Sequence, residues 1–329
     1  MAETLSLGVD LGGTKIEAAL LARRGVGASD DTGHEVPLRR RVPTRSELGY
    51  ASVLETTANL VRSVASEAGL ELARLPLGVG MPGSVTARDG LVKNSNTVCL
   101  NGRPFREDLM RALDRRIAFE NDANCFALAE AQLGAGKPYR HGVVFGVIMG
   151  TGVGGGIVMN GKVWPGPQHL GGEWGHHAVG PWRRHGVSGA GPSAVASAAL
   201  SERGVCYCGN TGCLELYLSG PALERDYARR SGHQKNLAEI AARRDLDVHA
   251  GAAIDEMLEA FGRGVANLID ILDPSAIVLG GGVSNLEFLL EEGRERVRRY
   301  VFNDELATPV VRNELGDSAG VLGAALLEA

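Results

Sequence analysis

The sequence predicts an α/β protein with two domains of similar build, on three observations. The chain has 329 residues, which is too many for one small core. Apolar strand patterns alternate with helical patterns along most of it. A strand, a glycine-rich turn and a second strand occur at residues 8–20, and the same order returns at residues 143–158. Such an internal repeat indicates two related domains.

The expected elements follow from apolar spacing and from turn and capping residues. In the first half we expect strands at 5–11 and 15–21 around a tight turn, a helix at 50–68, a strand at 75–80, a helix at 108–113, a strand at 117–120 and a helix at 123–133. In the second half we expect strands at 143–149 and 154–158, a helix at 252–272, a strand at 276–279 and a last helix that begins near Asp317-Ser318, a plausible cap. The smaller domain is expected at residues 1–122 with 310–329, and the larger one at 123–309.

Composition and charge exclude several classes of function. The net charge is −5 and the isoelectric point about 5.9, so no global field favours nucleic acid or an anionic membrane. The run Arg39–Arg41 is expected to be a solvated strand or loop edge. We see no basic leader and no apolar stretch of membrane-spanning length, and therefore expect a cytoplasmic protein. The 46 glycines are about twice the usual share and cluster at turns, which indicates functional loops.

The first glycine-rich turn has the composition of a phosphate-binding loop. Backbone N–H groups reach phosphate oxygens most closely where side chains are absent, and a hydroxyl and a cation add donors. A plain hairpin turn needs glycine, but neither an aspartate before it nor Thr-Lys after it. Because a strand follows the lysine, the loop is not a Walker A motif. The candidate ATP ligands are Gly12, Gly13, Thr14 and Lys15, and Asp10 is the candidate Mg²⁺ ligand, directly or through water.

The second glycine-rich turn repeats the first. Residues 150–156 also match GxGxxG, but no helix follows and no acidic residue lies at the required distance, which argues against a dinucleotide site. As the second member of the repeat, the turn is expected to bind the outer phosphates of ATP. Its candidate residues are Gly150, Thr151, Gly152, Val153 and Gly154.

Asn121 and Asp122 stand where a strand gives way to a helix. Phosphoryl transfer to an alcohol needs alignment, charge neutralisation and a carboxylate that accepts the hydroxyl proton. Asp122 is the candidate for that base. A simple helix cap explains the same pair equally well from spacing alone.

Three of the five cysteines lie close together in the sequence, which favours a metal site over a disulfide framework. The expected Zn²⁺ ligands are His176, Cys206, Cys208 and Cys213. A closed tetrahedral set of three thiolates and one imidazole is structural rather than catalytic. His177 is the alternative fourth ligand. Cys99 and Cys125 have apolar neighbours and are expected in the core.

Together these motifs resemble the ROK family of sugar kinases and repressors, over essentially the whole chain. The matching positions are Asp10–Lys15, Asn121-Asp122, Gly150–Ile157, Glu173–His176, Cys206–Glu215 and Gly280–Gly282. The resemblance implies an actin-like, RNase H-like fold with ATP and sugar bound between two domains. It also implies Asp122 as the catalytic base, and Gly281 and Gly282 as further ATP ligands. The sugar ligands that it implies are Asn121, Asp122, Glu173, His176 and Glu215, with His176 also on zinc.

Within the family, the motifs look most like bacterial fructokinase/mannokinase, on the segments 92–96, 100–105, 173–176, 206–208 and 231–233. We therefore expect phosphorylation of a hexose at the 6-hydroxyl, with fructose first and mannose or glucose next. The alternative is an N-acetylglucosamine or N-acetylmannosamine kinase. N-acetylglucosamine kinases share residues 121–128 and the zinc knuckle, and residues 183–205 depart from the fructokinase pattern.

A remote alternative is a sugar-responsive repressor of the same family. Such a repressor would carry a DNA-binding segment, whereas the first strand is expected to begin by Leu5 with no basic recognition helix before it. The resemblance also implies a homodimer that binds a hexose and ATP, but neither nucleic acid nor a membrane.

Overall fold

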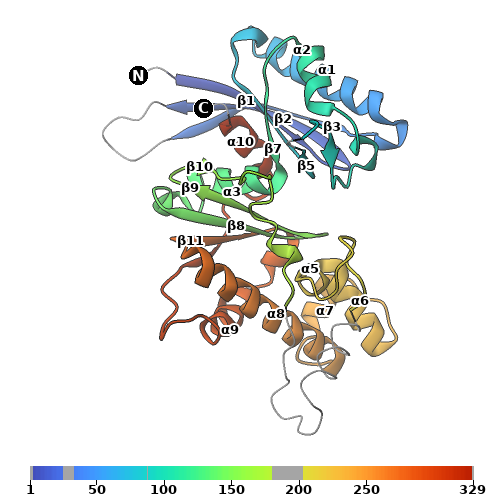
Figure 1. Cartoon of the computed structure of the whole chain (residues 1–329), viewed down its shortest axis with the longest axis vertical. Coiled ribbons are helices and arrows are strands. Elements are labelled where there is room, and N and C mark those ends of the chain that lie inside the picture. Colours follow the sequence, from blue (N-terminus) through green and yellow to red (C-terminus); the bar gives the residue numbers. More distant parts are fainter. Residues whose placement is uncertain (1–2, 25–32, 87, 180–202, 328–329) are drawn as a thin grey trace. The chain divides into compact units, whose positions relative to one another are not determined.

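The computed structural model describes residues 3–24, 33–86, 88–179 and 203–327 (Figure 1). The strands in these ranges are β1 (Glu3–Leu11), β2 (Lys15–Arg24), β3 (His34–Pro43), β4 (Leu77–Met81), β5 (Ser84–Val85), β6 (Val92–Lys93), β7 (Ala118–Asn121), β8 (Val143–Met149), β9 (Val153–Met159), β10 (Lys162–Val163), β11 (Ala276–Gly280) and β12 (Val310–Arg312). The α-helices are α1 (Tyr50–Glu67), α2 (Phe105–Leu113), α3 (Asp122–Gln132), α5 (Glu215–Leu218), α6 (Gly220–Ser231), α7 (Leu237–Ala242), α8 (Val248–Leu272), α9 (Arg294–Arg298) and α10 (Ala319–Leu326). None of the described helices combines the length and the apolar character that crossing a bilayer requires.

The predicted elements are present close to their expected bounds, and several further elements were not predicted. Helix α8 begins earlier than expected because the Asp247 side chain accepts the backbone N–H groups of His249 and Ala250. Helix α7 was missed, although Asn236 and Glu239 form a capping box at its start. Strand β3 was expected only as a strand or loop edge around Arg39–Arg41, and helix α6 was missed, because both are rich in charged residues and lack a clear apolar period.

Two five-stranded sheets have matching strand orders. The first is ordered β3-β2-β1-β4-β7 and the second β10-β9-β8-β11-β12. In the first sheet, β1 pairs antiparallel with β2 and parallel with β4. Each sheet therefore places a hairpin next to strands that arrive from later in the chain, in the same sequence of positions. The internal repeat predicted from the two glycine-rich turns is confirmed at the level of strand order.

Backbone contacts divide the chain into two compact units. Unit 1 comprises Met1–Gly146, Gly156–Gly172 and Asn313–Ala329, and unit 2 comprises Val147–Gly155 and Glu173–Arg312. The domain boundary expected after residue 122 does not coincide with this division, because α3 packs against α10 within unit 1. The two expected domains therefore stay a prediction, and the units below are the structural ones.

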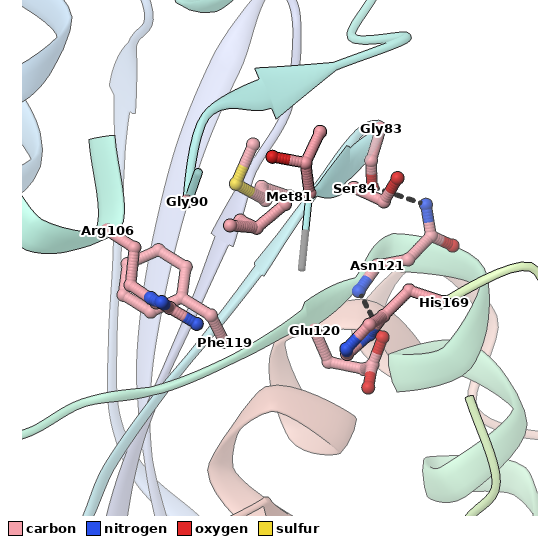
Figure 2. A pocket seen from close by; sticks show the side chains of 11 residues that line it. Met81, Gly83, Ser84, Gly90, Arg106, Phe119, Glu120, Asn121 and His169 are labelled. Atoms are coloured by element: carbon pink, nitrogen blue, oxygen red, sulfur yellow. Dashed lines mark hydrogen bonds between the residues drawn. The ribbon is translucent and has the colours of Figure 1, made fainter. Parts of the chain in front are cut away.

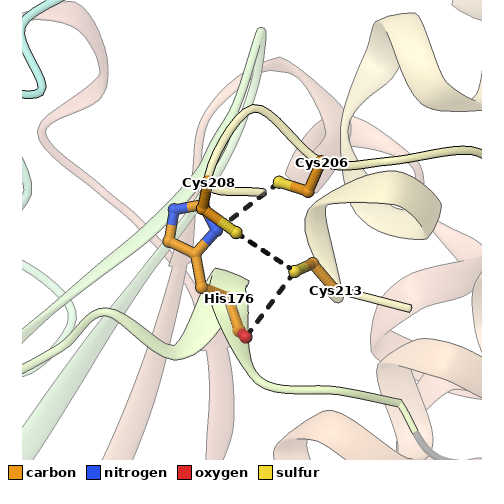
Figure 3. Close-up of side chains that lie close together, drawn as sticks. All are labelled: His176, Cys206, Cys208 and Cys213. Carbon is orange, nitrogen blue, oxygen red and sulfur yellow. Dashed lines mark hydrogen bonds between the residues drawn. The ribbon is translucent and has the colours of Figure 1, made fainter. Parts of the chain in front are cut away.

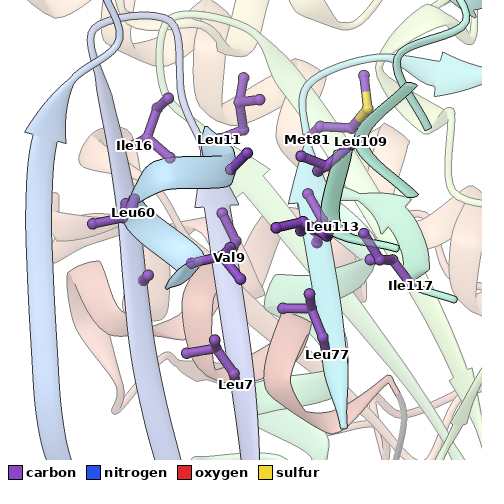
Figure 4. Packing of buried hydrophobic residues seen from close by; sticks show 14 of the residues in the cluster. Leu7, Val9, Leu11, Ile16, Leu60, Leu77, Met81, Leu109, Leu113 and Ile117 are labelled. Atoms are coloured by element: carbon purple, nitrogen blue, oxygen red, sulfur yellow. The ribbon is translucent and has the colours of Figure 1, made fainter. Parts of the chain in front are cut away.

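The apolar core of unit 1 lies on one face of the first sheet. Alternate residues of β1, namely Leu7, Val9 and Leu11, are fully buried against side chains of α1 and α2 such as Leu60 and Leu109 (Figure 4). Burial of one such side chain stabilises the fold by about 1.5–3 kcal/mol. This alternation explains why the strand is readable from the sequence.

The other face of the same sheet is covered by α10. The backbone of the helix lies so close that a Cβ on Gly8 would be 2.0 Å from Val321 O, and one on Gly78 would be 2.0 Å from Ala324 O. Glycine at both positions is therefore required by close approach. As a result, Asp10, two residues after Gly8 on the same face, points toward the start of α10.

The Arg39–Arg41 run lies on β3, the edge strand of the first sheet, but it is not simply solvated as expected. Arg39 and Arg41 both pair with Glu17, whose side chain is buried on β2. Arg40 pairs with the exposed Glu67. A buried carboxylate must be paired, and two guanidinium groups from the neighbouring strand serve that purpose here.

The cap expected at the start of the C-terminal helix is wrong in detail. Ser318 precedes α10, but its side chain makes no capping hydrogen bond. Its hydroxyl instead accepts a hydrogen bond from Arg39 Nη1 at 2.9 Å. A short 3₁₀ turn, Gly316–Ser318, leads into the helix in place of the expected cap.

Candidate active site and metal centre

The turn between β1 and β2 closes on Gly12. Its N–H donates to Lys15 O at 2.9 Å, and a Cβ on Gly12 would lie 2.9 Å from the same oxygen. Thr44 fixes the turn from outside, because its N–H donates to Thr14 O and its hydroxyl donates to Gly12 O. Gly13 and Thr14 at the tip are exposed. The turn is thus held rigidly from below and open at its tip, as a phosphate-binding loop must be.

Asp10 lies at the end of β1, beside the start of α10. A Cβ on Gly320 would be 2.8 Å from Asp10 Oδ2, so only glycine leaves room for the carboxylate. Burial, and then the Glu17 carboxylate, raise the pKa of Asp10 to about 6, while Lys15 and Arg41 act in the opposite sense. A divalent cation would stabilise the ionised form, and carboxylate oxygen is a ligand that Mg²⁺ prefers. Asp10 therefore fits the predicted role.

Asn121 and Asp122 form the junction of β7 and α3. Asn121 Oδ1 accepts the Ala123 N–H at 2.8 Å, which makes Asn121 the N-cap, and its Nδ2 donates to Gly83 O at 2.9 Å. Asp122 Oδ1 lies 2.9 Å from the same Ala123 N–H. The cap interpretation is therefore correct for Asn121, and it leaves the base interpretation open for Asp122. The positive end of the helix stabilises a carboxylate at this position.

A polar cavity of about 170 Å³ lies beside Asn121 in unit 1 (Figure 2). Its lining includes Gly83, Ser84, Arg106, Glu120 and His169. Glu120 Oε1 accepts the Asn121 N–H at 2.8 Å, so the cavity wall and the strand–helix junction are one hydrogen-bonded structure. A water molecule takes about 30 Å³ in the liquid, so the cavity has room for a small polar group.

The second glycine-rich turn lies between β8 and β9. Gly150 N–H donates to Gly152 O at 2.9 Å, and Gly150 O accepts the Gly220 N–H at the start of α6. Val153 N–H donates to Glu215 Oε2 at 3.0 Å. One predicted sugar ligand therefore holds the second predicted phosphate loop in place. This link within unit 2 could not be read from the sequence.

The predicted ATP ligands Gly281 and Gly282 follow β11. Gly281 has φ +83°, and a Cβ there would lie 2.3 Å from Met149 O, at the end of β8. Both the backbone conformation and the space therefore require glycine. Gly281 and Gly282 are exposed, and Gly281 lies directly against the strand that leads into the second glycine-rich turn.

The four predicted zinc ligands come together in unit 2 (Figure 3). Their ligand atoms all lie within 4.8 Å of one another. The Sγ atoms of Cys208 and Cys213 are 3.6 Å apart, and Cys206 Sγ is 3.6 Å from His176 Nδ1. A tetrahedral zinc with bonds of about 2.3 Å to sulfur and about 2.0 Å to nitrogen separates its ligands by roughly 3.5–3.8 Å. These two distances match the spacing of zinc ligands, and the histidine in the cluster is His176 rather than His177.

The pKa shifts of two of the cysteines also suit a cation, whereas a hydrogen bond from the Asn210 backbone lowers the pKa of the exposed Cys208. Burial is the main cause that raises the pKa of Cys206 and, to about 12, that of Cys213. Thiolates are the metal-binding form, so these side chains need a positive ion to ionise at neutral pH. When bound, zinc would supply that charge and tie the knuckle to His176. Zinc itself stays a prediction. Cys125 is buried as expected, whereas Cys99 is only partly buried.

Glu173, Trp174 and His176 lie on one short turn. Trp174 is buried, and its Nε1 donates to Gly154 O at 2.7 Å, which anchors the turn to β9. Glu173 is exposed, and its Oε2 is 4.0 Å from His176 Nε2. On the other side of the knuckle, Glu215 Oε1 is 3.8 Å from Cys206 Sγ. The sugar ligands that the resemblance implies for unit 2 thus surround the metal centre.

Tyr207 was not predicted as a site residue, yet it touches this centre. Its hydroxyl is 2.9 Å from His176 Nε2, and the two rings meet edge to face. The contact joins residues 31 positions apart, so no local pattern signals it. The predicted site residues thus form two sets, Asp10–Lys15 with Asn121-Asp122 in unit 1 and the others in unit 2. The segment 183–205, which departs from the fructokinase pattern, lies outside the described residues except for its last three.

Comparison with known proteins agrees with this fold. The model of the ROK family matches residues 6–329. The chain is 37% identical to an N-acetyl-D-glucosamine kinase of Vibrio atlanticus, over 97% of this chain and 98% of the relative. It is 35% identical to the N-acetylgalactosamine kinase AgaK of a Shewanella species, over 97% of this chain and 95% of the relative. The crystal structure of a ROK hexokinase from Thermus thermophilus superposes with a TM-score of 0.79 at 32% identity, covering 99% of this chain and 98% of that one.

The fold is that of the two-domain, actin-like sugar kinases. The chain belongs to the ROK family, and within it to the sugar kinases. The fructokinase likeness expected within the family is less well supported, because the two relatives from Vibrio atlanticus and Shewanella are acetamido-sugar kinases by their names.

Proposed function

We propose that this enzyme transfers the γ-phosphoryl group of ATP to the 6-hydroxyl of an N-acetyl-D-hexosamine, with N-acetylglucosamine as the first candidate. The observation that carries the proposal is the 37% identity to an N-acetyl-D-glucosamine kinase along nearly the full length of both chains. Fructose was the first expectation from the sequence, and the acetamido alternative now takes its place. The N-acetylgalactosamine kinase relative widens the substrate class to acetamido hexoses.

In the proposed mechanism Asp122 accepts the proton of the attacking hydroxyl. Its position in the first turn of α3 favours the ionised carboxylate, and the adjacent Asn121 is fixed by bonds to both Gly83 and Ala123. Because Asn121 cannot turn freely, it can hold the sugar in one orientation against the base. Correct alignment is the main contribution that a protein makes to phosphoryl transfer.

The two glycine-rich turns are proposed to bind the phosphates of ATP, and Asp10 to hold Mg²⁺. Both turns are braced by hydrogen bonds from outside, by Thr44 in unit 1 and by Glu215 in unit 2. Braced loops keep their N–H donors aligned without the cost of ordering them at each turnover. Magnesium, when bound with ATP, would neutralise charge that develops on the phosphates. Zinc is proposed as a resident structural ion, and a homodimer as the assembly.

The test is an ADP-release assay with Mg-ATP and a panel of sugars: N-acetylglucosamine, N-acetylgalactosamine, N-acetylmannosamine, glucose, mannose and fructose. A kcat/KM at least ~100-fold higher for an acetamido hexose than for the others, about 2.7 kcal/mol in transition-state free energy, supports the proposal. A preference of that size for fructose would return the assignment to fructokinase and reject the acetamido substrate. Metal analysis and light scattering of the same preparation test zinc and the dimer.

A further inference from the structure

The polar cavity of unit 1 adjoins the residue pair that is expected to hold the sugar. Its volume is about 170 Å³, and all of its lining residues belong to unit 1. Asn121 lies in its wall, directly before Asp122 in the chain. A general base must lie within hydrogen-bond reach of the hydroxyl group whose proton it accepts. A sugar whose attacking hydroxyl meets Asp122 therefore lies next to this cavity, and another of its substituents can enter it.

The cavity offers the three contacts that an acetamido group needs, because such a group has a methyl, an N–H donor and a carbonyl acceptor. Met81, Val85 and Phe119 form the apolar part of the wall. Glu120 contributes a carboxylate on one side, and Arg106 contributes a guanidinium on the other (Figure 2). At about 30 Å³ for each of its four heavy atoms, an acetamido group needs roughly 120 Å³, which the cavity can hold.

Glu120 is held so that one carboxylate oxygen remains available. Its Oε1 accepts the Asn121 N–H at 2.8 Å and an Asn124 Nδ2–H at 3.0 Å. Among the residues that the structure describes, none forms a hydrogen bond with its Oε2. A carboxylate oxygen is an acceptor, which suits an amide N–H group. Because the bonds to Oε1 fix the side chain, Oε2 is oriented before the ligand arrives.

Arg106 supplies donors on the other side of the cavity. Its Nε and Nη2 donate to Glu107 Oε1 at 3.0 and 2.7 Å, which fixes the guanidinium. A guanidinium has five N–H donors, and the other three have no protein partner within the described ranges of the chain. A carbonyl oxygen cannot donate and needs such a donor. Hydrogen bonds from a charged donor are roughly twice as strong as those between neutral groups.

We infer that this cavity is the specificity subsite for the acetamido group. Arg106 donates to the carbonyl oxygen, Glu120 Oε2 accepts the amide N–H, and the apolar part of the wall contacts the methyl. The inference rests on the proposed function, since it assumes an acetamido hexose. Glucose has only a hydroxyl group at the same carbon and leaves the cavity to water. Loss of the guanidinium should therefore weaken acetamido sugars much more than glucose.

The first test is Arg106→Met, which keeps an unbranched side chain on α2 and removes the donors. The ion pair between Arg106 and Glu107 is solvent-exposed, so its loss should cost little stability. Calorimetric Kd values without ATP, and kcat/KM with Mg-ATP, are measured for N-acetylglucosamine and glucose. We expect both constants to worsen by about 10–100-fold for N-acetylglucosamine, the range for loss of one charged hydrogen bond, and by less than about threefold for glucose.

Arg111→Met is the matched control. Arg111 lies on the same helix, is 76% exposed and pairs with Asp108, but it does not line the cavity. This variant should bind both sugars as the wild type does. A second test needs no variant, because N-formylglucosamine lacks only the methyl group. We expect it to bind the wild-type enzyme about fourfold more weakly than N-acetylglucosamine, the effect of one buried methylene.

Three results would overturn the inference. Equal losses for both sugars in Arg106→Met would show a general effect on unit 1, and unchanged constants for N-acetylglucosamine would show that the guanidinium makes no contact. Equal binding of N-formylglucosamine and N-acetylglucosamine would place the methyl group outside the cavity. Failure of the proposed function is visible separately, because the wild-type enzyme would then prefer a sugar without an acetamido group.

Discussion

Helix α10 is fitted to α3 so closely that one added methyl group should disrupt unit 1. A Cβ on Gly323 would lie 1.8 Å from Cys125 O and 2.4 Å from the carbonyl carbon. An ordinary carbon–oxygen contact needs about 3.3 Å, so the two helix backbones must separate by roughly 1.5 Å. The helix cannot yield toward the sheet either, because Gly8 and Gly78 already touch its backbone.

The expected cost of Gly323→Ala follows from this geometry. Overpacking typically costs 1–3 kcal/mol and backbone clashes lie at the upper end, while alanine regains about 1 kcal/mol of helix propensity. We expect a net loss of about 2 kcal/mol in unfolding free energy, or roughly 4–8 °C in Tm for a unit of this size. Gly33→Ala is the matched control, since nothing lies within 4 Å of a Cβ there.

The assay is urea and thermal unfolding followed by circular dichroism, with activity measured on the same samples. A Gly323→Ala protein whose unfolding free energy is within about 0.5 kcal/mol of the Gly33→Ala protein would refute the packing of α10 on α3 described here. Lost activity with unchanged stability would also contradict it, because the clash lies in the helix backbones rather than in the site.

Two further predictions concern the metal centre and a buried carboxylate. Cys208→Ser should lose zinc, as measured by elemental analysis, and should lower the stability of unit 2 by several kcal/mol, because metal binding energy is folding energy. Cys99→Ser is the control. Full retention of zinc by Cys208→Ser would reject Cys208 as a ligand. Glu130 is buried and accepts backbone N–H groups of Ala135, Glu314 and Leu315, and burial is the main cause that raises its pKa. The folded state therefore binds this proton more tightly than the unfolded chain, and stability falls as pH rises from about 4.3 through the folded pKa. In urea unfolding between pH 4 and 8, Glu130→Gln should flatten that slope, and an unchanged slope would assign it to other groups.

The fold could be predicted largely because its first strands carry regular alternation. Leu7, Val9 and Leu11 alternate with Gly8, which makes room for α10, and with the polar Asp10, so the strand period and the turn after it were both visible in the sequence. The extent of strand β3 and its ion pairs could not be predicted, because an edge strand that pairs its arginines with a buried Glu17 has the sequence pattern of a charged surface. Propensity does not show which partner lies across a sheet.

The candidate site also has a part that the sequence predicts and a part that it does not. Cys206, Cys208 and Cys213 are close in sequence, so the metal spacing was local and readable. Asn121 is a helix cap, which was one of the two interpretations of the pair Asn121-Asp122. Its side-chain amide also donates a hydrogen bond to Gly83 O. The contact of Tyr207 with His176 joins two turns that are 31 positions apart, so only the three-dimensional structure shows it.

Asp122→Asn is the most direct test of the proposal that Asp122 is the catalytic base of a sugar kinase. Asparagine keeps the Oδ1 that lies 2.9 Å from the Ala123 N–H, so the start of α3 should be preserved. The measurement is kcat for N-acetylglucosamine with Mg-ATP, together with the calorimetric Kd of the sugar. A fall in kcat of about 10²–10⁴-fold with the Kd within about threefold is the predicted result. A variant that keeps a kcat within about threefold of the wild type would contradict the assignment of the base.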